Sequence, residues 1–396
     1  MANDPSIPWR ALLEGLVPED RAAGLLQAML WGGAAARARW STWTAAIGDP
    51  RGFFERDYVG RKGLLAFLAQ RLRDNEIDGP DFATYARVAL VREELRSRIF
   101  IDTLHAVQDG MDVAGLEPIL VNGAAYAFTV YPQPLLRHNH GIDLLLPAAQ
   151  LDAAQRVTTA AGFRLERTAT LPRGVLETYR HGTGLELTLR SPLSLTPHSK
   201  GEPTGFRSRC EEIRVDQFRV RVLAAADRLC HTLGESAAAP TRRNLRWACD
   251  VYLLLNRAAP LDFDHVVTTA VELGTALPTA VLLEFFRGDL ASAVPVEVIA
   301  ELRNRGTPRS ADEQNLLLST ALRTSASVDE FVRRARAQTT LFQKAARFAL
   351  FPSAEHIAYQ QRPTARWRIP WLYVTRMARL LARPLRRLRG LRMVPS

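Results

Sequence analysis

Apolar residues recur three and four positions apart over the first 115 residues of the chain, a spacing that predicts helices. Leu25, Leu26 and Met29 form one such face, and Gly and Pro residues separate the successive pieces. A longer stretch of the same period predicts a single helix from about residue 81 to 109. We therefore expect a helical N-terminal region over residues 1–115.

Short apolar runs bounded by turn residues replace the helical period at Pro118, and such runs predict buried strands. We expect a sheet in residues 116–222, and a return to helices in residues 223–350. The fold class predicted by this order is α+β, with a mixed sheet between N-terminal and C-terminal helical segments. The predicted strands are Ile119 to Val121, Ile142 to Leu146, Phe163 to Arg167, Val175 to Arg180, Leu185 to Arg190 and Phe218 to Val222.

The net charge of +11 is concentrated at the C-terminal end of the sequence. After Glu355 the chain has ten arginines and no acidic residue, so the preceding body is nearly neutral and nucleic acid is not a favoured partner. Leucines and aromatic residues alternate with these arginines, which predicts a basic amphipathic tail in residues 351–396. Residues 362–396 suit an anionic membrane surface, although the same apolar stripe could pack on the body of the protein instead.

No run of about 18 uncharged apolar residues is present, and the first residues lack the basic and apolar segments of a secretory signal. We therefore expect a cytoplasmic protein, with the tail as a means of peripheral binding at the inner membrane.

Two acidic residues, Asp143 and Glu186, lie inside predicted strands, where a charge is costly to bury unless it is paired or bound to metal. Residues two apart on a strand point to one face, so Gly141 shares a side with Asp143. Two carboxylates from neighbouring strands could hold Mg²⁺ against a nucleoside triphosphate. The alternative is that both acids face solvent at a sheet edge.

These residues belong to a pattern that resembles the uncharacterised bacterial nucleotidyltransferase family, which is related to the polymerase-β superfamily. The resemblance covers residues 117 to 255 and implies a minimal sheet of four to six strands. The matching segments are Ile119-Leu120-Val121-Asn122-Gly123-Ala124-Ala125-Tyr126-Ala127, Tyr131-Pro132, Arg137, Gly141-Ile142-Asp143-Leu144-Leu145-Leu146, Leu185-Glu186-Leu187 and Leu245-Arg246-Trp247-Ala248-Cys249-Asp250-Val251.

The resemblance implies that Asp143 and Glu186 are catalytic residues and ligands of Mg²⁺, which would activate an acceptor and neutralise the leaving pyrophosphate. The partners would be a nucleoside triphosphate and a small-molecule, glycan-related or peptide acceptor. Arg246 is a further candidate that would approach the nucleotide from the helical side. The predicted nucleotide-binding residues are Asn122, Gly123, Ala124, Arg137 and Arg246.

Three positions depart from the family pattern. Gly141 stands where the family has the first aspartate of an Asp-x-Asp pair, Asn122 replaces a lysine, and Thr188 replaces a histidine. Losing one of three carboxylates leaves few anionic ligands for two divalent ions. Two hypotheses therefore remain open, namely a nucleotidyltransferase and a catalytically degenerate protein that binds nucleotide or serves as a membrane-proximal scaffold.

Overall fold

The computed structural model describes residues 9–324, apart from 57–59, 78–79, 167–174, 192, 194–201, 239–243 and 309, together with residues 370 and 373–374. The chain divides into two compact units. The smaller unit comprises Met1–Leu13 and Pro308–Ser396, and its helices α1 (Trp9–Leu13) and α15 (Ala311–Thr324) contact each other. The larger unit, Glu14–Thr307, contains the sheet and every candidate residue named above. The end of the helical segment predicted over residues 223–350, from residue 325 onward, and nearly all of the basic tail lie outside the described residues.

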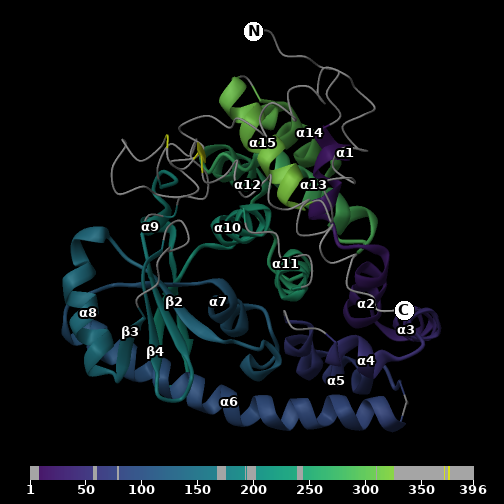
Figure 1. Cartoon of the computed structure of the whole chain (residues 1–396), viewed down its shortest axis with the longest axis horizontal. Coiled ribbons are helices and arrows are strands. Elements are labelled where there is room, and N and C mark those ends of the chain that lie inside the picture. The colour runs from purple at the N-terminus through teal and green to yellow at the C-terminus, as the bar shows by residue number, and fades with distance from the viewer. Residues whose placement is uncertain are drawn as a thin grey trace, which may run out of the picture. The chain divides into compact units, whose positions relative to one another are not determined.

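Within the described part of the chain, seven strands form one mixed sheet in the order β3-β4-β5-β2-β1-β7-β6 (Figure 1). β2 lies near the middle, antiparallel to β1 on one side and parallel to β5 on the other. The strands are β1 (Ile119–Val121), β2 (Gly141–Leu145), β3 (Phe163–Glu166), β4 (Val175–His181), β5 (Glu186–Arg190), β6 (Glu211–Val215) and β7 (Phe218–Val222).

The α+β class is confirmed, but the predicted number of strands was too low by one. β6 was missed because it is an edge strand that pairs only with β7. Of its five residues, Val215 alone is buried, so the strand lacks both the apolar runs and the period-two alternation by which the other six were recognised.

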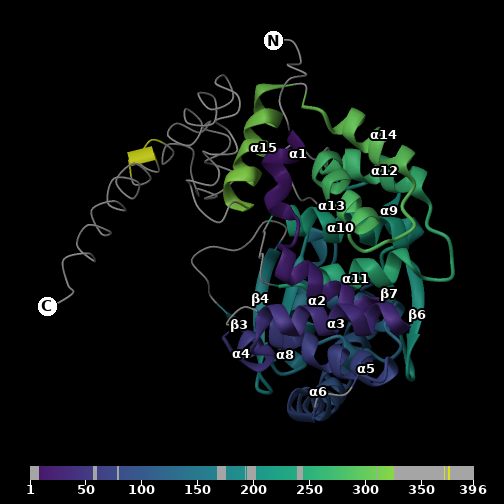
Figure 2. The same cartoon turned by 90° about the vertical axis from the view of Figure 1, so that its right-hand side faces the viewer.

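Helices precede and follow the sheet within the larger unit (Figures 1 and 2). The predicted long helix is present as α6 (Pro80–Val113), which is longer at its C-terminal end than the sequence pattern indicated. The other helices of this unit are η1 (Glu14–Leu16), α2 (Asp20–Leu30), α3 (Gly33–Ile47), α4 (Pro50–Glu55), η2 (Arg61–Leu64), α5 (Leu65–Asp74), α7 (Asn122–Thr129), η3 (Pro134–Leu136), η4 (Ala148–Gln150), α8 (Leu151–Ala160), α9 (Phe206–Arg209), α10 (Ala225–Ala238), α11 (Arg246–Leu255), α12 (Phe263–Glu272), α13 (Ala276–Gly288) and α14 (Val296–Gly306).

The alternation of side chains along β2 places the hydrophobic core and the polar site on opposite faces of the sheet. Ile142 and Leu144 are buried in a cluster with Phe100 of α6 and Ala154 of α8. Asp143 points to the other face, the side on which α10 supplies its polar neighbours. The core packing of α6 and α8 thus fixes which way the Asp143 carboxylate points.

No helix among the described residues is both long enough and apolar enough to span a membrane.

Candidate functional site

Asp143 and Glu186 lie on the same face of the sheet. In the parallel pairing of β2 with β5, Gly141 is opposite Glu186 and Asp143 is opposite Thr188. The backbones of the two acidic residues are therefore about 8 Å apart, because strands are spaced by about 4.8 Å and two residues span about 6.6 Å. Side chains at this distance can reach a common ligand, but in this structure they point to different partners.

Asp143 is held by an arginine from the neighbouring strand. Arg190 donates from Nε to Asp143 Oδ1 across 2.7 Å, and from Nη1 to Glu235 Oε1 of α10 across 2.8 Å. The side chain of Asn122 also forms a hydrogen bond with Glu235, so these four residues form one network. Although burial opposes its charge, the two carboxylates raise the pKa of Arg190, so a permanent cation sits beside Asp143.

Glu186 has a partner on the opposite side of β5. Arg180 of β4 donates to Glu186 Oε1 across 2.8 Å and also binds Glu166 of β3. Both Glu186 and Arg180 are more than two-fifths exposed, so this pair is weak compared with the one at Asp143. The Glu186 carboxylate is directed along the sheet towards β4, away from Asp143.

Gly141 leaves no room for the carboxylate that the family pattern has at this position. A Cβ atom added to Gly141 would lie 2.5 Å from the carbonyl oxygen of Glu186 and 3.0 Å from its Cβ. Both contacts are far closer than van der Waals distance, and the first involves backbone that is paired in the sheet. The space beside Gly141 is therefore filled rather than free.

The turn predicted to receive phosphates begins α7 directly after β1. Asn122 adopts a φ of 59°, a left-handed conformation that asparagine tolerates better than most residues. Gly123 follows, and a Cβ there would lie 2.8 Å from Nη2 of Arg137 and 2.7 Å from Oδ1 of Asn139. The absence of a side chain at Gly123 lets the Arg137 guanidinium and the Asn139 amide approach its backbone closely. Ala124 is buried beneath the turn.

Three residues of the sequence pattern, Tyr131, Arg137 and Asp250, form one buried network. Arg137 donates to both oxygens of Asp250, across 2.7 Å and 2.8 Å, and the Tyr131 hydroxyl donates to Asp250 Oδ1 across 2.9 Å. The Asp250 side chain is only 3% exposed and that of Arg137 is 10% exposed. Despite the opposing effect of burial, Asp250 raises the pKa of Arg137. Arg137 thus ties the loop before β2 to α11.

Arg246 lies beside this network without a carboxylate partner. Its Nη1 donates to the carbonyl oxygen of His138 across 3.2 Å, and Nη1 of Arg137 donates to the same oxygen across 2.6 Å. Arg246 makes no ion pair with any described residue, and its remaining contacts are to Asn244. Burial and the neighbouring Arg137 lower the pKa of Arg246 to about 10.

The two histidines of the loop contact each other. His138 donates from Nδ1 to Glu93 Oε1 across 2.6 Å, and its Nε2 lies 3.0 Å from Nε2 of His140. Burial and the adjacent charges, His138 first among them, lower the pKa of His140. His140 is therefore directed to His138, and no contact joins it to Asp143.

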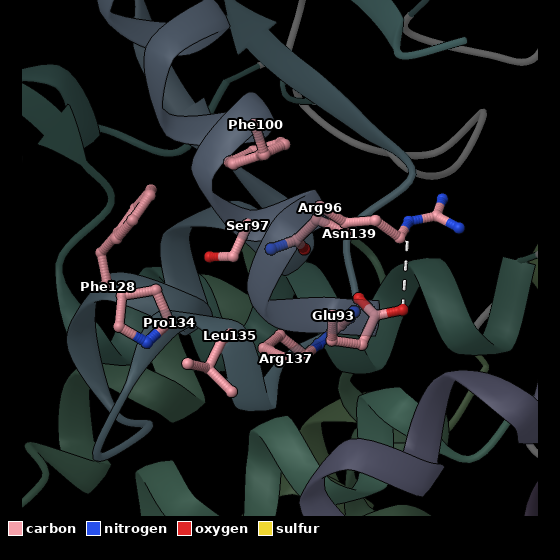
Figure 3. A pocket seen from close by; sticks show the side chains of 9 residues that line it. All are labelled: Glu93, Arg96, Ser97, Phe100, Phe128, Pro134, Leu135, Arg137 and Asn139. Atoms are coloured by element: carbon pink, nitrogen blue, oxygen red, sulfur yellow. Dashed lines mark ion pairs between the residues drawn. The ribbon is translucent and has the colours of Figure 1, made fainter. Parts of the chain in front are cut away.

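A small hollow opens beside Arg137 and Asn139, between α6 and the end of α7 (Figure 3). Glu93 and Arg96 form an ion pair on its α6 side at 4.0 Å. The free space, open solvent included, is about 280 Å³, which falls below the ~300–1,000 Å³ of most ligand pockets. This hollow does not hold a whole nucleotide by itself.

The donor set does not fit two magnesium ions. Asp143 and Glu186 are each paired with an arginine, Glu235 is paired with the same arginine as Asp143, and Gly141 supplies no ligand. Within the described residues, no group of three or more His, Cys, Asp and Glu side chains could hold a metal ion. Two divalent ions on a triphosphate require several anionic ligands, which these paired carboxylates do not supply.

The residues that sequence reasoning missed are Arg190 and Glu235. Arg190 carried a detectable signal, because Glu186, Thr188 and Arg190 follow one another at period two on β5 and must share the face of Asp143. Glu235 gave no such signal in the sequence, because it lies on α10 and is brought to the site by contacts between segments that are distant in sequence.

The fold and the site define a protein of the nucleotidyltransferase class, with a glycine turn after the first strand and an acidic residue on each of two adjacent strands. A model of the uncharacterised nucleotidyltransferase family matches residues 57–287, and the chain belongs to this family. The resemblance stated from the sequence is thereby confirmed. No match was found among curated proteins or among solved structures.

Proposed function

We propose that the chain binds a nucleoside triphosphate through arginine side chains and does not carry out two-metal nucleotidyl transfer. The observation that carries this proposal is the pairing of Asp143 with Arg190, which also binds Glu235. A guanidinium between two carboxylates supplies the positive charge that a divalent ion would otherwise provide. Asp143 is therefore already neutralised when no metal is bound.

Arg246 and the start of α7 support phosphate binding. Arg246 is a partly buried guanidinium that forms no ion pair with any described residue, and burial together with the neighbouring Arg137 lowers its pKa. A bound anion would accept hydrogen bonds from this charged guanidinium. Arg137, its neighbour at the His138 carbonyl, packs on Gly123, so the amides at the start of α7 are close by.

The proposal is tested by titrating the four common nucleoside triphosphates into the intact protein in a calorimeter, with Mg²⁺ and with EDTA. We expect binding of at least one of them in EDTA, with no release of pyrophosphate in either condition.

The substitution Arg246→Gln should weaken binding by about tenfold or more, as expected for the loss of a charged hydrogen bond. Arg219→Gln, in an exposed ion pair on β7, is the matched control and should leave binding unchanged. Binding that disappears in EDTA would contradict the proposal.

The second candidate is transfer of a nucleotidyl group to a small-molecule, glycan-related or peptide acceptor. It is favoured by the placement of Asp143 and Glu186 on one face of adjacent parallel strands. This function would require Mg²⁺ and the separation of Asp143 from Arg190. Pyrophosphate release that depends on Mg²⁺ and is abolished by Asp143→Ala would establish this candidate and exclude the first.

A further inference from the structure

The long helix α6 has a stripe of exposed apolar side chains on the side that faces away from the sheet. Among the described residues, five of the eight exposed large apolar side chains belong to this helix. Four of them are spaced by three and four residues, so they lie along one helical face. They are Val88 (54% exposed), Val91 (58%), Leu95 (60%) and Ile99 (44%).

This stripe is separate from the face by which α6 packs on the protein. Phe100, Leu104, Val107 and Met111 are buried in the core beneath the sheet. A surface helix of a globular protein ordinarily has one apolar face and is polar on the other. Removing apolar side chains of this size from water is favourable, so the second stripe favours a further contact.

Charged residues beside the stripe are distributed unequally along α6. Arg87 and Arg92 flank its N-terminal part, whereas Asp102 and Asp109 lie further along the same side. Arg87, Arg92 and Asp102 are exposed and form no ion pair with any described residue. Glu94 is paired with Arg98, and Glu93 with Arg96. The exposed charges that have no ion partner are therefore basic towards the N-terminal end of the stripe and acidic at Asp102, which is complementary to a second copy in the antiparallel orientation.

We propose that a second copy of this chain docks on this face, with the two α6 helices antiparallel and the twofold axis midway between Leu95 and Ile99. Positions equally far from the axis then meet. Leu95 packs on Ile99 of the partner subunit, and Arg92 faces Asp102 of the partner subunit. The contact extends from Val88 to Ala106, a length of about 27 Å along the helix. Figure 1 shows α6 along the edge of the larger unit, with its outer side clear of the sheet and of the other helices of that unit.

The first test is sedimentation velocity of the full-length protein over a range of concentrations. We expect a concentration-dependent dimer, and Leu95→Glu should raise the dimer dissociation constant at least tenfold. Leu165→Glu is the matched control, because Leu165 is 48% exposed on β3 and lies outside the stripe. A monomer at every concentration, or a dimer unaffected by Leu95→Glu, would overturn the proposal.

Charge exchange tests the orientation and does not depend on an apolar substitution being tolerated. Arg92→Asp and Asp102→Arg should each weaken the dimer, because each places like charges opposite one another. The variant with both changes should regain the affinity of the wild type, since the two charges again oppose across the axis. Failure to regain dimerisation would exclude the antiparallel pair. It would instead indicate that the two copies meet through this stripe in another orientation.

Discussion

The carbonyl oxygen of Glu186 lies 2.5 Å from the point at which a side chain at Gly141 would begin. The two residues are register partners on β2 and β5, so neither can move away without loss of strand pairing. By resemblance, the family has an aspartate at this position. At this position the backbones of β2 and β5 lie too close together for an aspartate side chain to fit.

The first prediction concerns this contact. Gly141→Ala should lower the free energy of unfolding by about 1–3 kcal/mol, since the added methyl group forces the strands apart. Urea denaturation gives the value. Gly182→Ala is the control, because a Cβ at Gly182 meets nothing within 4 Å. A Gly141→Ala variant as stable as the control would show that β2 and β5 can separate at no cost.

A second prediction follows from the charge at Asp143. If arginines bind the triphosphate, Asp143→Asn should increase its affinity up to about tenfold, because one negative charge near the phosphates is removed. Calorimetry in EDTA measures the change. Glu186→Gln should have little effect, as Glu186 is 45% exposed and paired with Arg180. Weaker binding of the triphosphate to Asp143→Asn than to the wild type in EDTA would contradict this prediction.

The sequence predicted the elements of this fold well where apolar residues mark them. Six of the strands were recognised, five from short strand-like runs and β7 from its period-two alternation, and the long helix α6 was recognised from its helical period. β6 was not recognised, because Glu211 and Glu212 are exposed at the sheet edge and give no apolar signal.

The candidate site was predictable only in part, for a physical reason. The shared face of Asp143 and Glu186 follows from strand periodicity and is seen in the register. The partners of these acids depend on tertiary contacts, such as Arg190 with Glu235 of α10, which are 45 positions apart. Arg137, predicted from the resemblance to contact phosphate, has both carboxylate oxygens of Asp250 as its partners. Its role towards a nucleotide stays a prediction.

The third prediction tests the network at Asp250. Asp250→Ala leaves the Arg137 guanidinium buried without a counter-charge and should lower the free energy of unfolding by about 3–5 kcal/mol. Tyr131→Phe removes one hydrogen bond to the same carboxylate and should cost about 1 kcal/mol. The double variant Arg137→Met with Asp250→Leu should be more stable than Asp250→Ala, because no buried charge then remains without a counter-charge. Equal losses in all three variants would refute this account.

The pH dependence of stability provides a fourth prediction. Burial raises the pKa of Glu235, but Arg190, His231 and Asn122 outweigh it and lower the pKa below its ordinary value. A carboxyl whose pKa is lower in the folded state stabilises the protein fully above its unfolded pKa, near 4.5. This stabilisation is lost as the pH falls from there through the folded pKa. Glu235→Gln should therefore flatten the acid limb of the stability curve below about pH 4.5 and leave its shape near pH 7 unchanged. An identical acid limb in wild type and variant would contradict the pKa shift.

The fifth prediction concerns the arginine-rich tail in residues 362–396, of which only residues 370 and 373–374 are described. If it binds an anionic membrane, the full-length protein should float with vesicles that contain phosphatidylglycerol at low salt and remain behind at high salt. Replacing Arg386, Arg387 and Arg389 together by glutamine should reduce binding by about 100-fold, at about 1 kcal/mol for each arginine. Arg51, Arg56 and Arg98, exposed arginines of the larger unit, give a control triple variant with the same change in net charge. If the apolar residues of the tail pack on the protein instead, neither the variants nor the wild type will float. The tail substitutions will then alter the unfolding temperature alone.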